Sequence, residues 1–216
     1  MSRELEKQLA AEAAAAMVRP GMRVGLGTGS TVAYLLRALS HRRVDATYVA
    51  SSPQTASAAR RLGIGVEDGE WAGDLHLAID GADQITRDGW LIKGGGGAHA
   101  REKVIAASAH RFVVIADSSK LVANLTPPVP LELMAFGIEA TLRRVDPAVR
   151  RDGPPSPDGG VIADYYGDVA DPMRLSHQLS SIVGVVAHGI FAPDLVSEIL
   201  IGSKDGIRRT TIGAPS

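Results

Sequence analysis

The segment GLGTGSTVAYLL, residues 25–36, places three glycines and then the pair Ser30-Thr31 between a short apolar run and an apolar helical pattern. Glycine lets the backbone approach a ligand closely, and the amides that begin a helix attract anions. We expect a strand over residues 22–27, a glycine turn, and a helix over residues 31–39 that Ser30 caps. The segment therefore predicts an anion-binding turn where the first strand ends.

The N-terminal half continues to alternate between strand and helix patterns. Apolar runs predict strands, whereas periodic segments bounded by Ser, Gly or Pro predict helices. The expected strands cover residues 46–51, 75–80 and 111–117, and the expected helices cover 3–18, 53–62 and 98–109. Ser52 is expected to cap the helix at 53–62. Hairpins are expected at 88–89 and 205–206. This alternation predicts a mostly parallel sheet with helices on both faces.

The sequence pattern changes near Thr126, where TPPVPLELM contains three prolines. We expect a helix from about Asp171 to Ile182 between two further strand patterns. The predicted fold is α/β, with a Rossmann-like, mostly parallel sheet domain formed by residues 1–126 plus 198–216. Residues 127–197 are predicted to form a smaller α+β subdomain of ferredoxin-like type.

Composition excludes several classes of function. The 216 residues carry a net charge of −1, so a nucleic-acid partner is not expected. There is no cysteine, the six histidines are scattered, and no metal site is expected. No apolar run approaches the roughly 18 residues of a membrane span. We therefore expect a cytoplasmic globular protein without a membrane partner.

The glycine turn alone is compatible with several kinds of ligand. It lacks the lysine of a nucleotide-binding P-loop. The second expected strand ends in ASSPQT (50–55), without the carboxylate that would hold a ribose in a dinucleotide site. A small phosphate ester is the favoured ligand, and a tight turn without any ligand is the alternative.

Further polar residues follow other expected strands. Asp80 and Asp83 end one strand, Lys93 precedes a run of glycines, Glu102 lies near a helix start, and Lys120 follows another strand. Each alone is typical of a turn or a solvated surface. Together they supply acids, a base and cations around a phosphate site, which is what proton transfer beside a carbonyl requires. The residues favour an aldose–ketose isomerisation, which needs no cofactor.

The motifs that carry this chemistry also resemble a known family. They are VGLGTGST (24–31), DGAD (80–83), KGGGGAHAREK (93–103) and IADSSK (115–120), followed by PVPLEL (128–133) and FAPDLVSEILIGSKDGI (191–207). In this order they are similar to D-ribose 5-phosphate isomerase, type A. The resemblance implies interconversion of ribose 5-phosphate and ribulose 5-phosphate in the pentose phosphate pathway, by a homodimer or homotetramer.

The resemblance also implies roles for individual residues. Glu102 corresponds to the general base, and the other implied catalytic residues are Asp80, Asp83 and Lys93. The implied substrate-binding residues are Lys7, Thr28, Gly29, Ser30, Thr31, Asp80, Gly81, Ala82, Asp83, Lys93, Gly94, Gly95, Gly96 and Lys120. Asp80 to Asp83 match the segment that holds sugar hydroxyls and assists ring opening.

Some positions depart from the family pattern and leave alternatives open. They are Gln84, His99, the run SPDGGVIAD (156–164) and NLTPPVPLEL (124–133). One alternative is a paralogue that acts on a modified pentose phosphate. Another is a non-catalytic sugar-phosphate sensor, for which the chain lacks a DNA-binding module. A third, acyl-CoA transfer through a glutamate, lacks a site for a large nucleotide.

Overall fold

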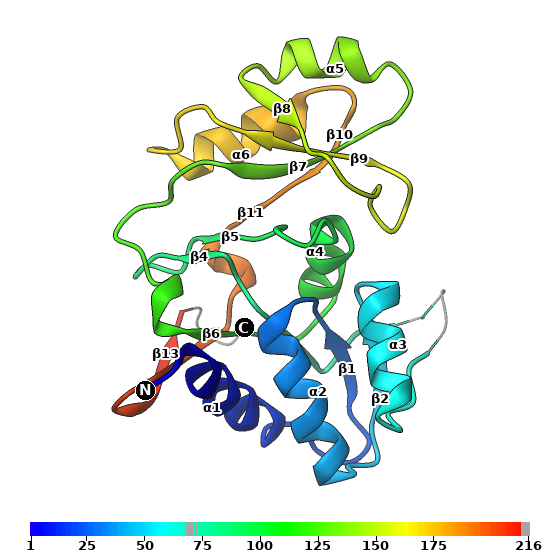
Figure 1. The fold of residues 1–216 in the computed structure, drawn as a ribbon, viewed down its shortest axis with the longest axis vertical. Coiled ribbons are helices and arrows are strands. Elements are labelled where there is room, and N and C mark those ends of the chain that lie inside the picture. The colour runs from blue at the N-terminus through cyan, green and yellow to red at the C-terminus, as the bar shows by residue number, and fades with distance from the viewer. Residues whose placement is uncertain (68–70, 72, 213–216) are drawn as a thin grey trace. The chain divides into compact units, whose positions relative to one another are not determined.

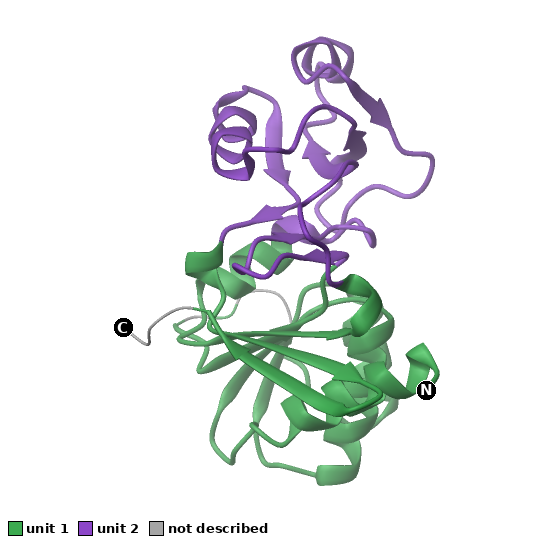
Figure 2. Ribbon diagram, turned by 90° about the vertical axis from the view of Figure 1, so that its left-hand side faces the viewer, with its two compact units in different colours: residues 1–82, 101–120, 193–216 green, residues 83–100, 121–192 purple. Residues whose placement is uncertain are grey.

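The computed structural model describes residues 1–67, 71 and 73–212, which form two compact units (Figure 2). Unit 1 comprises Met1–Ala82, Arg101–Lys120 and Pro193–Ser216, and unit 2 comprises Asp83–Ala100 and Leu121–Ala192. Unit 2 thus includes residues 83–100 as well as most of the segment expected to form the subdomain. The predicted domain bounds at 126/127 and 197/198 stay a prediction.

A six-stranded sheet forms the centre of unit 1 (Figure 1). Its order is β13-β12-β6-β3-β1-β2, and every neighbouring pair is parallel except the β12–β13 hairpin. The strands are β1 (Arg23–Leu26), β2 (Thr47–Ala50), β3 (Leu77–Asp80), β6 (Phe112–Asp117), β12 (Glu198–Ser203) and β13 (Gly206–Thr211). The predicted mostly parallel sheet and the hairpin at 205–206 are therefore confirmed.

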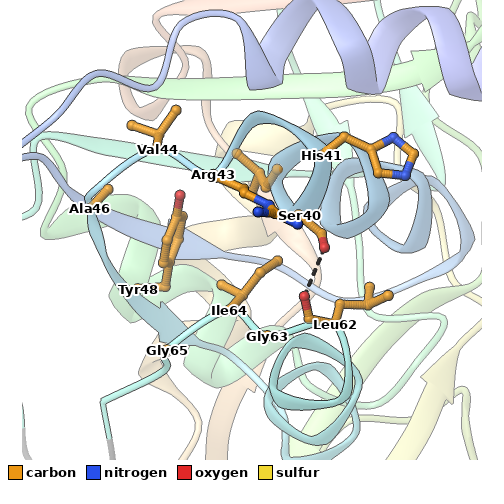
Figure 3. A pocket seen from close by; sticks show the side chains of 11 residues that line it. Ser40, His41, Arg43, Val44, Ala46, Tyr48, Leu62, Gly63, Ile64 and Gly65 are labelled. Carbon is orange, nitrogen blue, oxygen red and sulfur yellow. Dashed lines mark hydrogen bonds between the residues drawn. The ribbon is translucent and has the colours of Figure 1, made fainter.

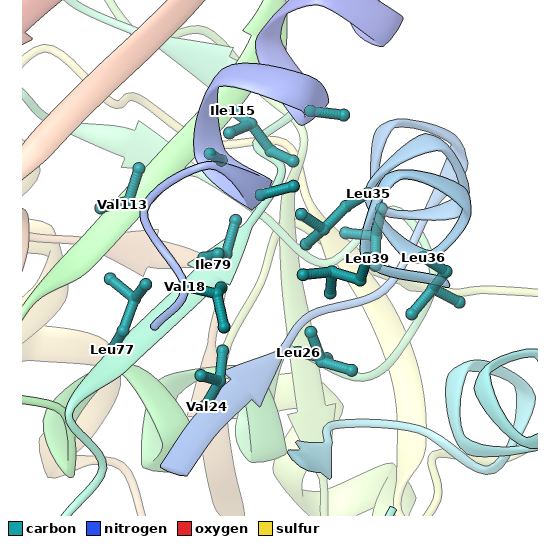
Figure 4. Close-up of a cluster of buried hydrophobic side chains, with 14 of the residues drawn as sticks. Val18, Val24, Leu26, Leu35, Leu36, Leu39, Leu77, Ile79, Val113 and Ile115 are labelled. Carbon is teal, nitrogen blue, oxygen red and sulfur yellow. The ribbon is translucent and has the colours of Figure 1, made fainter. Parts of the chain in front are cut away.

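Helices cover both faces of this sheet. They are α1 (Arg3–Ala15), α2 (Ser30–Arg42), α3 (Pro53–Arg61) and α4 (His99–Ala107). Two short 3₁₀ helices, η1 (Ser118–Lys120) and η2 (Pro193–Leu195), also belong to unit 1. Val24 and Leu26 of β1 belong to the core formed with α1 and α2 (Figure 4), whereas the intervening Gly25 faces Ile105 of α4. This alternation follows from the two-residue period of a strand. None of the helices among the described residues is long and apolar enough to cross a bilayer.

Several predicted helix boundaries differ in the structure, and α2 ends at Arg42, three residues after its expected end. Ser30 is the first residue of α2 rather than its cap, because Gly29 takes the cap position with φ of +122°. That backbone conformation favours glycine, so the start of the helix is set by the turn and not by a side chain. The first helix ends at Ala15, three residues before its expected end. Ser52, in contrast, caps α3 as predicted and accepts from the Thr55 amide at 3.1 Å.

Unit 2 contains a four-stranded antiparallel sheet in the order β10-β7-β9-β8. Its elements follow one another as β7 (Val129–Leu133), α5 (Ile138–Arg144), β8 (Ala148–Arg150), β9 (Val161–Tyr165), α6 (Pro172–Ser181) and β10 (Val185–His188). This β-α-β-β-α-β order is the ferredoxin-like topology and confirms the predicted class of the smaller part. Leu131 and Leu133 of β7 pack with Leu175 and Leu179 of α6 in its core.

A second small sheet in unit 2 has the order β11-β5-β4. Its strands are β4 (Gln84–Ile85), β5 (Leu91–Ile92) and β11 (Ile190–Phe191), and β4 and β5 confirm the hairpin expected at 88–89. The apolar run 185–191 is divided at Gly189 between two sheets. A side chain there would lie 2.2 Å from the Lys93 carbonyl, so glycine is required where the chain passes from β10 to β11.

Candidate active site

In unit 1, the glycine turn after β1 is held by Asp80. Asp80 is the last residue of β3 and is 4% exposed. Its Oδ1 accepts from the Thr28 amide at 3.1 Å and from the Gly81 amide at 2.7 Å. A Cβ atom on Gly27 would lie 1.8 Å from this carboxylate. The first and second predicted motifs are thus brought together by a charge-assisted contact that only glycine permits.

We expect Gly27→Ala to destabilise the protein, because the new methyl group must displace Asp80 or the turn. Overpacking of this kind costs roughly 1–3 kcal/mol, which corresponds to a fall in Tm of roughly 2–10 °C for a chain of this length. Calorimetry measures the effect. Gly65→Ala is the matched control, since a Cβ atom there meets nothing within 4 Å. Equal melting of the two variants would contradict the close contact.

A cluster of hydroxyl groups supports the glycine turn after β1 through hydrogen bonds. The Thr28 hydroxyl lies 2.8 Å from both Ser51 Oγ and Ser52 Oγ. Thr55 completes the cluster and donates to the Gly27 carbonyl at 2.9 Å. The sequence alone predicts only a helix cap at Ser52 and does not reveal that these hydroxyl groups meet Thr28. Their signal is a run of hydroxyl residues at the carboxyl end of a strand beside the turn.

The exposed part of the turn leads into α2. Gly29 and Ser30 are exposed, and Thr31 is 8% exposed in the first helical turn. The amides that begin this 13-residue helix have no carbonyl partner within it. They present a partial positive charge to the solvent, so the arrangement suits a phosphate group.

Lys7 of α1 is tied to α2 through an intervening carboxylate. Its Nζ lies 3.0 Å from Glu4 Oε1, and Tyr34 of α2 donates to Glu4 Oε2 at 2.6 Å. The hydrogen bond from Tyr34, followed by that from Lys7, lowers the pKa of Glu4. The ammonium group of Lys7 therefore has a defined position next to α2.

The IADSSK motif is fastened to α1 by Glu6. This carboxylate accepts from the Ser118 hydroxyl at 2.7 Å and from the Ser118 amide at 3.0 Å, which lowers the pKa of Glu6. Lys120, half-buried, ends the short helix that Ser118 begins. Sequence reasoning missed Glu6, although a carboxylate on the same helix face as Ala10 and Ala14 was a usable signal.

Glu102 lies in the first turn of α4, where the sequence places it, and it is 5% exposed. A glutamate between charged neighbours is usually solvated, so this burial distinguishes Glu102 from a surface residue. Burial also lowers the pKa of the adjacent Lys103 to about 8. The Glu102 carboxylate is thus largely withdrawn from water, although Val104 in the same turn is exposed, and exclusion of water strengthens electrostatic interactions.

In unit 2, Lys93 is a buried cation. It is 3% exposed, and its Nζ lies 5.4 Å from the centre of the Phe191 ring, within range of a cation–π interaction. Its backbone amide donates to the Gly189 carbonyl at 2.8 Å, which fixes the strand end before the second glycine turn. A desolvated ammonium group of this kind can stabilise a developing negative charge.

The second glycine turn contacts the end of the DGAD motif. Asp83 Oδ2 accepts from the Gly95 amide at 2.8 Å. Gly94 has φ of +107°, and a Cβ atom on it would lie 2.7 Å from Nδ1 of the fully buried His99. His99, one of the departures from the family pattern, thus packs directly against the turn.

Two other departures have local structural partners. The Gln84 side chain donates to the Thr126 carbonyl and accepts from the Thr126 amide, both at 2.8 Å. A glutamate could only accept, so the amide suits this pairing. Within the run 156–164, Ser156 donates to Glu132 at 2.5 Å and organises the turn before β9.

A cavity of about 850 Å³ lies elsewhere in unit 1 (Figure 3). It is lined by Leu39, Ser40, His41, Arg43, Val44, Ala46, Tyr48, Leu62, Gly63, Ile64 and Gly65. Residues 43–46 precede β2, so this cavity lies where the sheet begins, whereas the predicted site residues follow the carboxyl ends of the strands. No predicted site residue lines it.

Comparison with known proteins gives consistent matches. The family model for ribose 5-phosphate isomerase A (phosphoriboisomerase A) matches residues 47–206. Ribose-5-phosphate isomerase A of Methanosarcina acetivorans is 45% identical, over 93% of this chain and 92% of its own. The solved structure of ribose 5-phosphate isomerase A from Methanocaldococcus jannaschii aligns with a TM-score of 0.90 at 33% identity, over 97% of this chain and all of the other. A D-ribose-5-phosphate isomerase in complex with phospho-erythronic acid aligns with a TM-score of 0.91 at 31% identity, over 98% and 100% of the two chains.

Proposed function

Because this chain belongs to the ribose 5-phosphate isomerase A family, we propose that it interconverts D-ribose 5-phosphate and D-ribulose 5-phosphate. It is an aldose–ketose isomerase of the type EC 5.3.1.6. The observation that carries the proposal is similarity over nearly the whole length of relatives named for this reaction. A paralogue with a modified substrate, a non-catalytic sensor and an acyl-CoA transferase are not favoured.

Glu102 is the general base of the proposed mechanism. Its carboxylate removes the proton from C2 of the open-chain aldose, and the electron pair of that bond forms the C1–C2 double bond of the enediolate. The proton returns to C1, while the proton of the C2 hydroxyl passes to the negatively charged C1 oxygen, so that C2 becomes the ketone and C1 carries a hydroxyl group. Burial of Glu102 supports this role, because a base withdrawn from water returns its proton to the substrate instead of losing it to solvent.

Lys93 supplies the positive charge for the enediolate oxygen. Its burial strengthens that interaction, since electrostatic energies rise as water is excluded. Asp80 and Asp83 hold sugar hydroxyls and assist ring opening, and their contacts to the two glycine turns support such placement. The other residues proposed to bind the sugar phosphate are Gly81, Ala82, Gly94, Gly95, Gly96 and Lys120.

The 5-phosphate binds where α2 begins. Gly29, Ser30 and Thr31 offer amides and hydroxyls there, and Thr28 supports the turn through its buried hydroxyl partners. Lys7 adds a positive charge from α1. This assignment rests on the glycine turn and on the helix start that follows it.

Ketose formation from ribose 5-phosphate in excess EDTA tests the proposal. We expect full activity, because no cofactor or metal is required when a lysine offsets the enediolate charge. Activity that falls with EDTA and returns with added metal would contradict the lysine-based mechanism. No ketose with or without metal would overturn the function itself.

We also infer that the protein assembles as a homodimer or homotetramer. In unit 2, Phe136 and Val183 are 88% and 80% exposed, and the neighbouring Met134 and Val186 are also exposed. Exposed apolar side chains in such numbers favour an interface. Light scattering should give the mass of two or four chains, and the mass of one chain would contradict the inference.

A location in the cytoplasm, testable by cell fractionation, completes the proposal and is supported by the sugar-phosphate substrate.

A further inference from the structure

The glycine run 94–97 needs its conformation to be imposed by neighbouring groups. Glycine loses more conformational freedom on ordering than any other residue. Gly94 and Gly97 have φ values of +107° and +71°, and the Gly97 amide donates to the Gly94 carbonyl at 3.0 Å. This bond closes the turn but does not fix its orientation. Contacts from outside the turn must therefore hold it.

Arg151 provides such a contact from the small antiparallel sheet. Its Nη1 donates to the carbonyls of Gly94 and Gly95, both at 3.1 Å. Arg151 directly follows β8, and its amide donates to the Ile162 carbonyl of β9 at 2.9 Å. The guanidinium group thus extends from a hydrogen-bonded strand end to two successive carbonyls of the turn.

Asp164 of β9 holds the guanidinium group in place. Nε of Arg151 donates to Oδ2 at 2.9 Å, and Nη2 donates to Oδ1 at 2.5 Å. A planar two-point contact of this kind fixes both position and orientation. The hydrogen bond to Asp164 is also the main cause that raises the pKa of Arg151, so the cation is retained.

Gly95 is held on its other side by Asp83. The Gly95 amide donates to Asp83 Oδ2 at 2.8 Å, while its carbonyl accepts from Arg151. The Asp83 carboxylate also interacts electrostatically with the guanidinium group. Both polar groups of one peptide residue are therefore bound by charged side chains of opposite sign.

We propose that Arg151, oriented by Asp164, is a positioning residue for the isomerisation, because it holds the carbonyls of Gly94 and Gly95. In this role it keeps the segment 93–97 in the backbone conformation that binds the sugar. The inference rests on the proposed function, which takes Lys93 and the glycines as substrate-binding groups. Misplacement of such a segment by about 1 Å can lower the rate by about 10²-fold.

The test compares Arg151→Met with Arg150→Met. Methionine keeps much of the length of arginine but removes the planar guanidinium group. Arg150, the neighbouring residue on β8, is exposed and serves as the control. We expect Arg151→Met to lower kcat/KM by roughly 10- to 100-fold, chiefly through kcat. Arg150→Met should stay within twofold of the wild type. Arg151→Lys, which keeps the charge without the planar fork, should lie between them.

Amide hydrogen exchange distinguishes a local effect on the turn from a general loss of stability, because a general loss would speed exchange throughout the unit. In Arg151→Met, residues 93–97 should exchange faster while the core strand β7 keeps its protection. A folded Arg151→Met with kcat/KM within twofold of the wild type, or with unchanged exchange at 93–97, would overturn the proposal. If this variant does not fold, Arg151→Lys and Asp164→Asn decide by the same two measurements.

Failure of the proposed function has a different signature. A wild-type chain that forms no ketose overturns the assigned reaction. Selectively faster amide exchange at 93–97 in Arg151→Met would still support the conclusion that Arg151 holds the glycine turn.

Discussion

We expect Glu102→Gln to lower kcat by roughly 10²- to 10⁴-fold, the usual contribution of a positioned general base. The amide keeps the shape of the side chain but cannot accept the proton from C2. Substrate binding should change little, because the proposed site binds the phosphate and the sugar hydroxyls through other residues. Steady-state kinetics with ribose 5-phosphate, combined with thermal melting to verify folding, measures the effect.

Glu139→Gln is the matched control for this variant. Glu139 is also a glutamate in the first turn of a helix, but it is exposed on α5. Its replacement should leave kcat within twofold of the wild type. If Glu102→Gln retained more than half of the wild-type turnover, Glu102 would not be the base.

Removal of the 5-phosphate from the substrate should have an effect at least as large. At the proposed site, two or three charge-assisted hydrogen bonds of about 1.5–3 kcal/mol each would hold this group, and their loss corresponds to a fall in kcat/KM of roughly 10²- to 10⁶-fold. Binding energy at this remote group positions C1 and C2 against the base. Free ribose and ribose 5-phosphate are compared at matched concentrations.

Lys7→Ala locates the phosphate within this comparison. It should raise KM for ribose 5-phosphate and leave the activity on free ribose unchanged. Lys204, an exposed lysine in the β12–β13 turn, serves as the control. Equal kcat/KM for the two sugars in the wild type would refute the assignment of a phosphate to the turn at 25–31.

The order of elements could be predicted from the sequence because each strand and helix has a local signature. The run FVVIAD predicts a buried strand, and Ser52-Pro53 predicts a helix start. The start of α2 could not be predicted as well, because Gly29 adopts a positive φ and removes the need for Ser30 as a cap. The break at Gly189 depends on a backbone approach from Lys93 that no local pattern reveals.

The motif residues could be placed at strand ends and helix starts, but their supporting residues could not. Glu6 meets Ser118 across more than a hundred positions of the chain, and Arg151 meets Gly94 across 57. Such contacts depend on strand order and register, which a single sequence does not specify. Burial could not be predicted either, since glutamate and lysine usually lie at the surface, whereas Glu102 and Lys93 are 5% and 3% exposed.

The order of strands in the six-stranded sheet has a consequence for synthesis on the ribosome. The strands β6, β3, β1 and β2 can pair once residue 117 has emerged, but β12 arrives only with residues 198–203. Until then β6, with all six residues buried in the finished sheet, is an unpaired edge. Apolar edges of this kind recruit other chains. We therefore expect the nascent chain to be most prone to aggregation while residues 121–192 are being made, until the terminal hairpin is added.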